Sequence, residues 1–415
     1  MFDVTAAPFA FPALQQKQVY MDNAGGSQVL GTVVESIRSY LLNTNVQLGA
    51  TYPISKASTS AYMKGYEAGA KFINAEPEEI SIGVSTTQLL HNLSTALKFE
   101  PGDELILSKL NHEANTAPWG KNRHAIEADC QMALLSDRTR LVACPHASNI
   151  TGTISPIREI ADAVHAHPRA LLCVDGVALA PHRQVDVKAL GVDFYVSAPP
   201  LLKVKNEKAF SWYKVYGPHL AQLYASTRIH DQIQSLAHFF KATDTLDLKL
   251  NLASANYELT QSIPHVVEYF GSNPAATWAA MAAHEERLQE ILLAFLTADE
   301  RITIIGDPSP AQDRRVPVIS FIIRGMGSQQ LVEAVEARTV YGFRSGHMYS
   351  HRLLADVCGL ANVEDGVVRV SFLHYNTAEA EVRGLVEVLG QVLGVWPSQS
   401  RAMPRMVCLS DVRLY

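Results

Sequence analysis

Short apolar runs alternate with helical patterns through the middle of the chain. The predicted strands are EISIGVS (79–85), DELILS (103–108), RLVACPH (140–146), ALLCVDG (170–176) and DFYVS (193–197). Residues 86–99 place apolar side chains at helical spacing, and residues 157–167 are amphipathic, so both segments are predicted helices. This alternation favours an α/β fold with a mainly parallel sheet covered on both faces, in which ligands bind at the carboxyl ends of the strands.

The last third of the chain has a different pattern. It predicts strands at 316–325 and 366–376 and helices at 328–338 and 378–393, which suits a smaller α+β domain. We therefore predict a large domain at 31–262, a small domain made of 1–30 and 263–397, and a loosely ordered tail at 398–415.

Composition narrows the class of protein. The chain has 415 residues, 47% of them hydrophobic and 18% charged, with a net charge of −6, so its charge gives no reason to expect nucleic acid or an anionic membrane as a partner. The first residues lack the basic and apolar regions of a signal peptide, and no stretch approaches a membrane span. The five cysteines show no CxxC spacing. We expect a cytoplasmic protein with reduced thiols and no metal site.

Two ionisable residues stand in apolar surroundings. Asp175 follows four apolar residues at the end of a predicted strand, where a carboxylate could keep a heterocyclic nitrogen such as that of pyridoxal phosphate protonated; a helix cap or turn residue is the alternative. Lys214 lies among Trp212, Tyr213 and Tyr216. A desolvated amine has a lowered pKa and can form a Schiff base, whereas a surface lysine lying over aromatic rings is the alternative.

Hydroxyl side chains mark a candidate anion site. Ser85, Thr86 and Thr87 lie where a predicted strand gives way to a helix, and helix-terminal N–H groups favour an anion there. A plain helix cap is the alternative. Ser211, three residues before Lys214, could also donate to a phosphate.

Further polar residues follow or interrupt strands. His112 could stack on a cofactor ring or could be a capping or core histidine, and Asn149 also follows a strand. Arg369 lies inside an apolar strand, where an unpaired charge would be costly, so we expect either a substrate carboxylate or a structural ion pair as its partner. Arg344 is similar but lies in a predicted loop.

The order of these residues resembles the class V aminotransferase, or cysteine-desulfurase-like, group of fold-type-I pyridoxal-phosphate enzymes. The resemblance spans nearly the whole chain. It is carried by YMDNAGGS (20–27), NHEAN (111–115), HASNITGTISPIREIADAVHAH (146–167), VDGVALAPHRQVDVKALGVDFY (174–195), FSWYKVYGPHLAQLYAS (210–226), FRSGH (343–347) and GVVRVSFLHYNTAEAEV (366–382).

The resemblance implies a role for each candidate residue and a homodimer as the assembly. Lys214 would bind the cofactor and move protons, Asp175 would pair with the pyridine nitrogen, and His112 would stack on the ring. The phosphate would be held by Thr86, Thr87 and Ser211. Asn149 would lie near the ring hydroxyl and the substrate, and Arg369, with Arg344, would bind a substrate carboxylate. Ala178 stands where the family often has Gln or His, which removes a hydrogen bond toward the ring's phenolic oxygen.

The choice among possible reactions is narrowed by the absence of a cysteine that the family's desulfurases carry. Desulfurases of the family carry a mobile cysteine after the Arg-x-Gly-His turn, but here Met348, Tyr349 and Ser350 follow it, and Cys358 lies well downstream in a predicted helix. Two of the matching segments are especially similar to a decarboxylating aldolase of the family. We rank decarboxylation and aldol addition at the β-carbon of a small amino acid first, with an aldehyde as second substrate. Desulfurase-type elimination, transamination and an inactive paralogue are the alternatives.

Two segments depart from the family in length. An insertion at about 197–209 precedes Lys214 and is predicted to be a surface loop, or a retained intron. The segment 120–139 is short, so we predict that a parallel edge strand is missing there.

Overall fold

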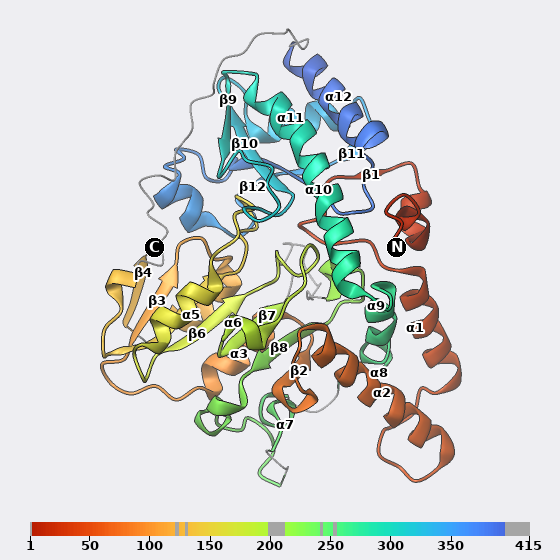
Figure 1. Ribbon diagram of the computed structural model, residues 1–415, viewed down its shortest axis with the longest axis vertical. Helices are drawn as coiled ribbons and strands as arrows, with labels where there is room; N and C mark the ends of the chain where they lie inside the picture. Colours follow the sequence, from red (N-terminus) through yellow and green to blue (C-terminus); the bar gives the residue numbers. More distant parts are fainter. Residues whose placement is uncertain are drawn as a thin grey trace.

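The computed structural model describes residues 2–120, 124–128, 132–197, 212–240, 244–251 and 255–394. In this part of the chain the strands form a seven-stranded, a four-stranded and a two-stranded sheet. Figure 1 shows the large sheet in the lower half of the molecule and the four-stranded sheet above it. Residues 198–209 of the predicted insertion before Lys214, the residue Ser211 and the predicted tail lie outside the described residues.

The seven-stranded sheet contains all the strands predicted for the middle of the chain. Its order is β2-β8-β7-β6-β5-β3-β4. The strands are β2 (Ile80–Gly83), β3 (Glu104–Ser108), β4 (His124–Ala128), β5 (Thr139–Pro145), β6 (Leu171–Asp175), β7 (Phe194–Ser197) and β8 (Ala221–Ala225). Strands β3 to β7 pair in parallel, and β8 runs antiparallel to β7 and β2. The prediction of a mainly parallel sheet is confirmed.

Helices cover both faces of this sheet. Because successive side chains of a strand point to opposite faces, Leu172 and Val174 of β6 pack in one apolar cluster and Leu171 and Cys173 in another. The first cluster includes residues of α2 (Pro53–Phe72), α5 (Ile157–His165) and α9 (Ile263–Tyr269). The second includes residues of α3 (Thr86–Ala96), α4 (Ala117–Gly120) and α7 (Leu246–Leu250). Burial on both faces explains the continuous apolar runs of these strands.

The prediction that an edge strand is missing was wrong. β4 pairs in parallel with β3 over its five residues and forms the edge of the sheet. An edge strand needs ladder hydrogen bonds from only one neighbour, so the short sequence HAIEA forms it without a long apolar run. In the described residues between β4 and β5, the chain forms the short 3₁₀ turn η5 (Met132–Leu134).

The four-stranded sheet is antiparallel and belongs to the last third of the chain. Its order is β12 (Arg344–Gly346), β13 (Val367–Ser371), β10 (Val318–Ile323) and β9 (Ile302–Ile305). Its apolar side chains pack with α10 (Pro274–Thr297), α11 (Ser328–Glu336) and α12 (Arg383–Leu393). A π-helical turn, η9 (Ala378–Val382), precedes α12, so the helix predicted at 378–393 has two parts.

The N-terminal segment joins the two sheets. β1 (Val19–Tyr20) pairs in parallel with β11 (Tyr341–Gly342). Asn23 Nδ2 donates to Ser371 O at 3.0 Å, and Ser27 Oγ donates to Tyr213 O at 2.8 Å, one residue before Lys214. Residues 20–27 therefore connect the small sheet to the segment that carries the lysine. The domain limits at 30/31 and 262/263 stay a prediction.

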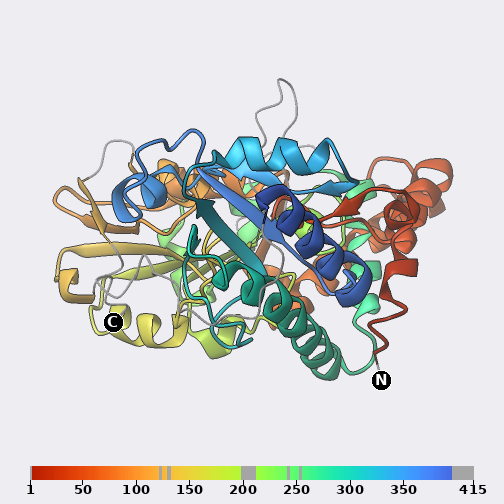
Figure 2. The same ribbon diagram turned by 90° about the horizontal axis from the view of Figure 1, so that it is seen from above.

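The remaining elements lie around this framework. Figures 1 and 2 show α1 (Gly31–Asn43) and α2 together on the side of the molecule away from β4. The shorter elements are η1 (Ala7–Ala10), η2 (Pro12–Gln15), η3 (Pro77–Glu79), η4 (Glu113–Asn115), α6 (Val187–Leu190), η6 (Trp212–Lys214), η7 (Thr227–Gln232), α8 (Tyr257–Thr260) and η8 (Leu353–Val357).

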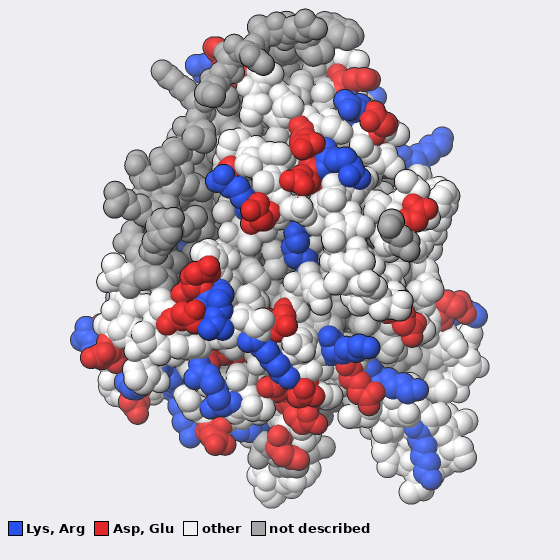
Figure 3. Space-filling model, in the orientation of Figure 1, with Lys and Arg blue, Asp and Glu red and all other residues white. Residues whose placement is uncertain are grey.

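Charges of both signs are interspersed on the face shown in Figure 3. Within the described ranges, none of the helices has the length and apolar character needed to cross a membrane. The same ranges contain no group of three or more His, Cys, Asp or Glu side chains arranged to hold a metal ion.

Candidate active site

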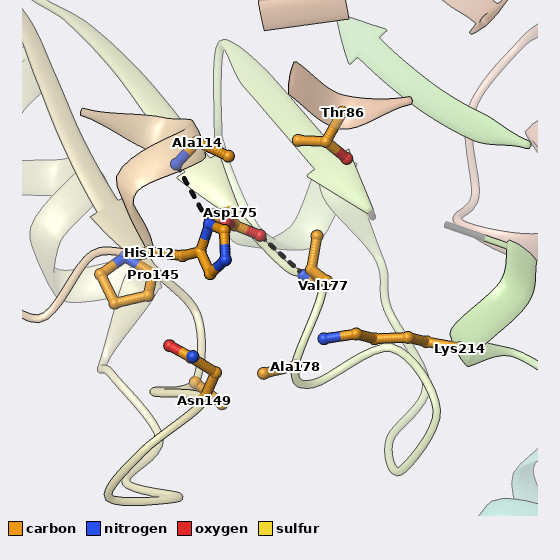
Figure 4. Close-up of a pocket in the computed structure, with 10 residues that line it drawn as sticks. Thr86, His112, Ala114, Pro145, Asn149, Asp175, Val177, Ala178 and Lys214 are labelled. Atoms are coloured by element: carbon orange, nitrogen blue, oxygen red, sulfur yellow. Dashed lines mark hydrogen bonds between the residues drawn. The ribbon is translucent and has the colours of Figure 1, made fainter. Parts of the chain in front are cut away.

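A cavity opens at the carboxyl ends of the large sheet's parallel strands (Figure 4). It has an empty volume of about 340 Å³, part of it open to solvent, and it is lined by Thr86, His112, Ala114, Pro145, Ala147, Asn149, Asp175, Val177, Ala178 and Lys214. Thr86 begins α3 after β2, Asp175 ends β6, and Lys214 ends η6 just before β8. His112 and Asn149 follow β3 and β5. The fold thus brings together candidates that are up to 128 positions apart in the sequence, from Thr86 to Lys214.

Asp175 is a buried carboxylate at the end of β6. Its Oδ1 accepts a hydrogen bond from Val177 N at 3.0 Å, drawn in Figure 4. Burial raises the pKa of Asp175 to about 6, while the Val177 hydrogen bond and the charge of Lys214 act in the opposite direction. The carboxylate is therefore mostly ionised at neutral pH and can stabilise a protonated ring nitrogen.

Lys214 extends its amine into the cavity (Figure 4). Burial lowers its pKa to about 7, with Arg369 and Arg344 adding to the shift and Asp175 and Asp22 opposing it. About half of the amine is therefore neutral at pH 7, which makes it a nucleophile.

The predicted aromatic environment of the lysine is present. Trp212 and Tyr216 are buried, and the ring of Tyr213 stacks on that of His219 at a centroid distance of 4.3 Å. Tyr216 has a left-handed backbone (φ 59°), which is unusual for a residue with a side chain, and its N–H donates to Ser27 Oγ at 2.8 Å. Ser27 therefore holds the turn that aims Lys214 into the cavity.

His112 is a capping residue, as one interpretation predicted, and its stacking on a cofactor ring stays a prediction. It is the N-cap of η4, where its Nδ1 accepts from Ala114 N at 3.1 Å, and its ring also lines the cavity. Burial lowers the pKa of His112 to about 3, so the imidazole is neutral. With Nδ1 accepting, the proton lies on Nε2, a buried atom without a hydrogen-bond partner among the described residues. The structure thus leaves one donor of His112 available inside the cavity.

The hydroxyl groups at the start of α3 have different roles. Ser85 is the N-cap, with its Oγ accepting from Gln88 N at 3.1 Å. Thr86 Oγ1 is buried and, within the described part of the chain, has no hydrogen-bond partner. Thr87 is half-buried and does not line the cavity. The capping alternative thus applies to Ser85, whereas the hydroxyl of Thr86 remains available for an anion.

Asn149 lines the cavity, but its amide also holds the loop at residues 348–350. Its Nδ2 donates to Met348 O at 3.0 Å, and its Oδ1 accepts from Ser350 Oγ at 3.0 Å. In this loop Met348 and Tyr349 have left-handed backbones, with φ of 42° and 61°. Such backbone conformations persist only where neighbouring contacts hold them. The predicted role of Asn149 beside the ring hydroxyl stays a prediction.

Tyr349 was not predicted as a site residue. Its ring lies 5.2 Å from the ring of His112 between centroids, and its carbonyl accepts from Glu113 N at 2.9 Å. The sequence marked its position, because it follows the Arg-Ser-Gly-His turn, but it did not show that the side chain would reach His112.

Arg344 and Arg369 lie beside the cavity rather than in its lining. Arg369 is fully buried on β13, where its Nη2 donates to Asp22 Oδ1 at 2.9 Å and its Nη1 to Asn149 O at 3.2 Å. Arg344 Nε donates to Asp22 Oδ2 at 2.6 Å. Of the two partners considered for Arg369, the structure contains the ion pair. Asp22 was missed because only tertiary pairing brings it to β13.

The three cysteines in the described part of the chain do not line the cavity. Cys144 and Cys173 are buried, and Cys358 caps the π-helical turn η8. Burial raises the pKa of Cys358 to about 11, so its thiol is protonated at neutral pH. None of these three side chains lines the cavity.

A buried lysine facing a strand-end aspartate and a neutral histidine, at the carboxyl edge of a mainly parallel sheet, defines a fold-type-I pyridoxal-phosphate enzyme. Residues 19–383 match the aminotransferase class-V family. The chain belongs to that family and is a pyridoxal-phosphate-dependent enzyme.

Two relatives cover nearly the whole chain. It is 48% identical over 413 residues to the aminotransferase-like protein FGM3 of Gibberella zeae, covering 94% of this chain and 99% of that protein. It is 35% identical over 418 residues to the cysteine desulfurase-like protein ustD of Aspergillus flavus, covering 95% of this chain and 91% of that protein.

Solved structures show the same fold. The cysteine desulfurase CsdA from Escherichia coli matches with a TM-score of 0.79 at 21% identity. A cysteine desulfurase from Thermococcus onnurineus NA1 matches with a TM-score of 0.81 at 20% identity. Each match covers 95% of this chain and 99% of the other.

Proposed function

We propose that this chain binds pyridoxal phosphate in the cavity and acts at the β-carbon of a small amino acid, by decarboxylation and aldol-type addition to an aldehyde. The observation that carries the cofactor assignment is the pair of Lys214 and Asp175, both buried in the lining of one cavity. Burying an amine and a carboxylate without a direct contact between them costs free energy. A ligand that interacts with both groups would offset this cost.

The remaining groups of the cavity fit the same cofactor. Thr86 Oγ1 and His112 Nε2 are buried polar atoms without partners among the described residues, and a native structure rarely leaves such atoms unsatisfied. Thr86 begins an eleven-residue helix whose first N–H groups favour an anion such as a phosphate. An anionic, planar heterocycle would supply partners for both atoms.

Each residue then has a definite task. When bound, pyridoxal phosphate supplies an electron-withdrawing ring. Asp175 would keep the ring nitrogen protonated, and Lys214 would form the covalent link and afterwards hold or move a proton at its Nζ. Ala178 presents a methyl group in the lining, so no hydrogen bond from this position reaches the ring oxygen.

The choice of reaction depends on where the cysteine thiols lie and whether they are ionised. A desulfurase needs an exposed thiolate that reaches the substrate's sulfur. Among the described cysteines none lines the cavity, and the thiol of Cys358 has a raised pKa. Carbon–carbon chemistry needs no protein thiol, and it is therefore our first choice over elimination of sulfur. Transamination needs no thiol either, and we rank it lower because two matching segments are especially similar to a decarboxylating aldolase of the family.

We also propose a homodimer. Exposed apolar side chains on α1 and α2 support this assembly, because these two helices carry five of the ten large apolar side chains that are exposed in the described chain, and apolar surface gathered on one part of a protein favours a protein contact. They are Val34, Leu41, Leu42, Ile54 and Met63.

One experiment tests the cofactor assignment. The purified protein is examined for a yellow chromophore that borohydride abolishes, and peptide mapping then locates the reduced adduct. We expect the adduct on Lys214, with exposed Lys188 as the control site that stays unlabelled. A colourless protein that takes up no pyridoxal phosphate would favour an inactive paralogue.

A second experiment tests the reaction. Aspartate, cysteine, cysteine sulfinate and alanine are offered with and without an aldehyde, and carbon dioxide, sulfide and sulfite are measured. Release of carbon dioxide from aspartate together with consumption of the aldehyde is expected. Release of sulfide from cysteine would overturn the choice of reaction while leaving the cofactor assignment intact.

A further inference from the structure

Two arginines share one aspartate where the N-terminal segment crosses the small sheet. Asp22 accepts from Arg369 Nη2 through Oδ1 and from Arg344 Nε through Oδ2, and the Arg344 Nη2 also contacts Oδ2. The Arg369 side chain is fully buried, whereas those of Arg344 and Asp22 are 29% and 24% exposed. The group, called here the Asp22 triad, therefore has one buried and two solvent-reachable members.

The position of Asp22 is fixed by its neighbours in the chain. Asn23 Nδ2 donates to Ser371 O and to Asn376 Oδ1, both at 3.0 Å, which anchors the segment on the end of β13. Gly25 lies against the triad, because a Cβ at that position would be 2.9 Å from Asp22 Oδ2 and 3.2 Å from Arg344 Nη2. A residue with a side chain at position 25 would have to displace the ion pair.

The Asp22 triad lies next to the reacting lysine. Arg369 Nη1 donates to the carbonyl of Asn149, whose side chain lines the cavity. The charges of Asp22, Arg344 and Arg369 each act on the pKa of Lys214, the aspartate raising it and the two arginines lowering it. A substrate held by the lysine would therefore meet the electric field of the triad.

The net charge of the Asp22 triad and the N–H donors of its arginines are suited to binding one carboxylate. Two guanidinium groups and one carboxylate sum to a net charge of +1. Each guanidinium has five N–H donors. Arg369 uses donors of its two Nη atoms on Asp22 and Asn149, and its Nε is buried without a partner in the described structure. Donors thus remain for an incoming carboxylate, but only one positive charge is left to balance it.

We propose that Asp22 is a specificity-determining residue: by neutralising one arginine of the pair, it leaves positive charge for one substrate carboxylate only, so that a second carboxylate, such as that on the β-carbon of aspartate, binds without a cationic partner. The inference rests on the proposed function only in taking an amino acid as the substrate. It predicts that monocarboxylates and dicarboxylates bind with similar affinity, since the second carboxylate gains no ion pair.

Calorimetric titration of the protein as purified, with propionate and with succinate, tests this. In the wild type we expect succinate to bind no more tightly than propionate. In Asp22→Asn the net charge of the pair becomes +2, and we expect the preference to shift toward succinate by about tenfold, the usual size of one charge-assisted contact. Asp162→Asn, which removes the carboxylate of the exposed Arg158–Asp162 pair, is the matched control and should leave the ratio unchanged.

A folded Asp22→Asn protein with the wild-type ratio of affinities would overturn the inference. If that variant does not fold, Arg344→Gln provides the second test, because it lowers the net charge to zero and should weaken binding of both ligands by about tenfold. Unchanged binding in Arg344→Gln would equally overturn it. Neither ligand has an amine or undergoes the reaction, so the ratio can be measured even if Lys214 proves not to carry the cofactor, and the two proposals fail separately.

Discussion

The two sides of the active site bury polar groups in opposite ways. On the side of the large sheet, Thr86 Oγ1 and His112 Nε2 are buried without partners in the described chain, and Lys214 has a lowered pKa. On the side of the small sheet, Arg369 and Arg344 already have a carboxylate partner in Asp22. The first side depends on a ligand to satisfy its polar atoms, whereas on the second side Asp22 balances one of the two arginine charges internally. A cofactor that stays bound can supply the missing hydrogen-bond partners on the first side. A substrate binds and leaves, so the second side needs part of its charge balanced when no substrate is present.

The largest effect is expected from Lys214→Ala. Loss of the covalent link and of the proton-transferring amine should lower turnover by about a thousandfold or more, within the usual range for a general acid or base. Measured turnover and the absence of a borohydride adduct check this. Lys188→Ala, an exposed lysine paired with Glu76, is the control, and an equal loss in that variant would contradict the special role of Lys214.

Arg369→Met tests whether the contacts of the Asp22 triad, on the side of the small sheet, stabilise the fold. The change leaves the buried carbonyl of Asn149 without its donor and removes one partner of Asp22, so we expect unfolding of the cofactor-free protein to become easier by about 1–3 kcal/mol. Chemical denaturation provides the measurement. Unaltered stability would mean that the Asp22 triad does not contribute to folding.

Thr86→Ala should give the opposite result. Its hydroxyl has no partner among the described residues, so removing it should change the stability of the cofactor-free protein by less than about 1 kcal/mol. The dissociation constant of pyridoxal phosphate should rise about tenfold to a hundredfold, because a charge-assisted hydrogen bond to the phosphate is lost. Equilibrium dialysis measures that constant. A large loss of stability with unchanged cofactor affinity would reverse the contrast between the two sides.

The smallest effect is the pH dependence of cofactor uptake. Because burial lowers the pKa of Lys214 to about 7, the neutral amine is the major form above that pH and the ammonium below it. The rate of adduct formation by the cofactor-free protein should fall about tenfold from pH 8 to pH 6 and level off above pH 8. Stopped-flow absorbance follows this rate. A rate that keeps rising to pH 10 would show an ordinary, solvated lysine.

Much of the fold and half of the site could be read from local patterns. The strands of the large sheet were predicted because burial on both faces requires continuous apolar runs, and Asp175 and His112 were found because they follow such runs. The edge strand β4 was missed because an edge carries no such run. Asp22 and Tyr349 were missed as site residues because their neighbours are hundreds of residues away in the chain.

The sequence by itself determined the class of fold and the family, and it predicted the lysine that binds the cofactor, since these depend on apolar periodicity and on motifs within short segments. Only the tertiary structure decided that Ser85 caps α3 while the Thr86 hydroxyl has no partner among the described residues, and that Asp22 neutralises one arginine of the pair. The reason is that hydrogen-bond partners and charge balance are properties of groups brought together through space. No pattern within one segment records them.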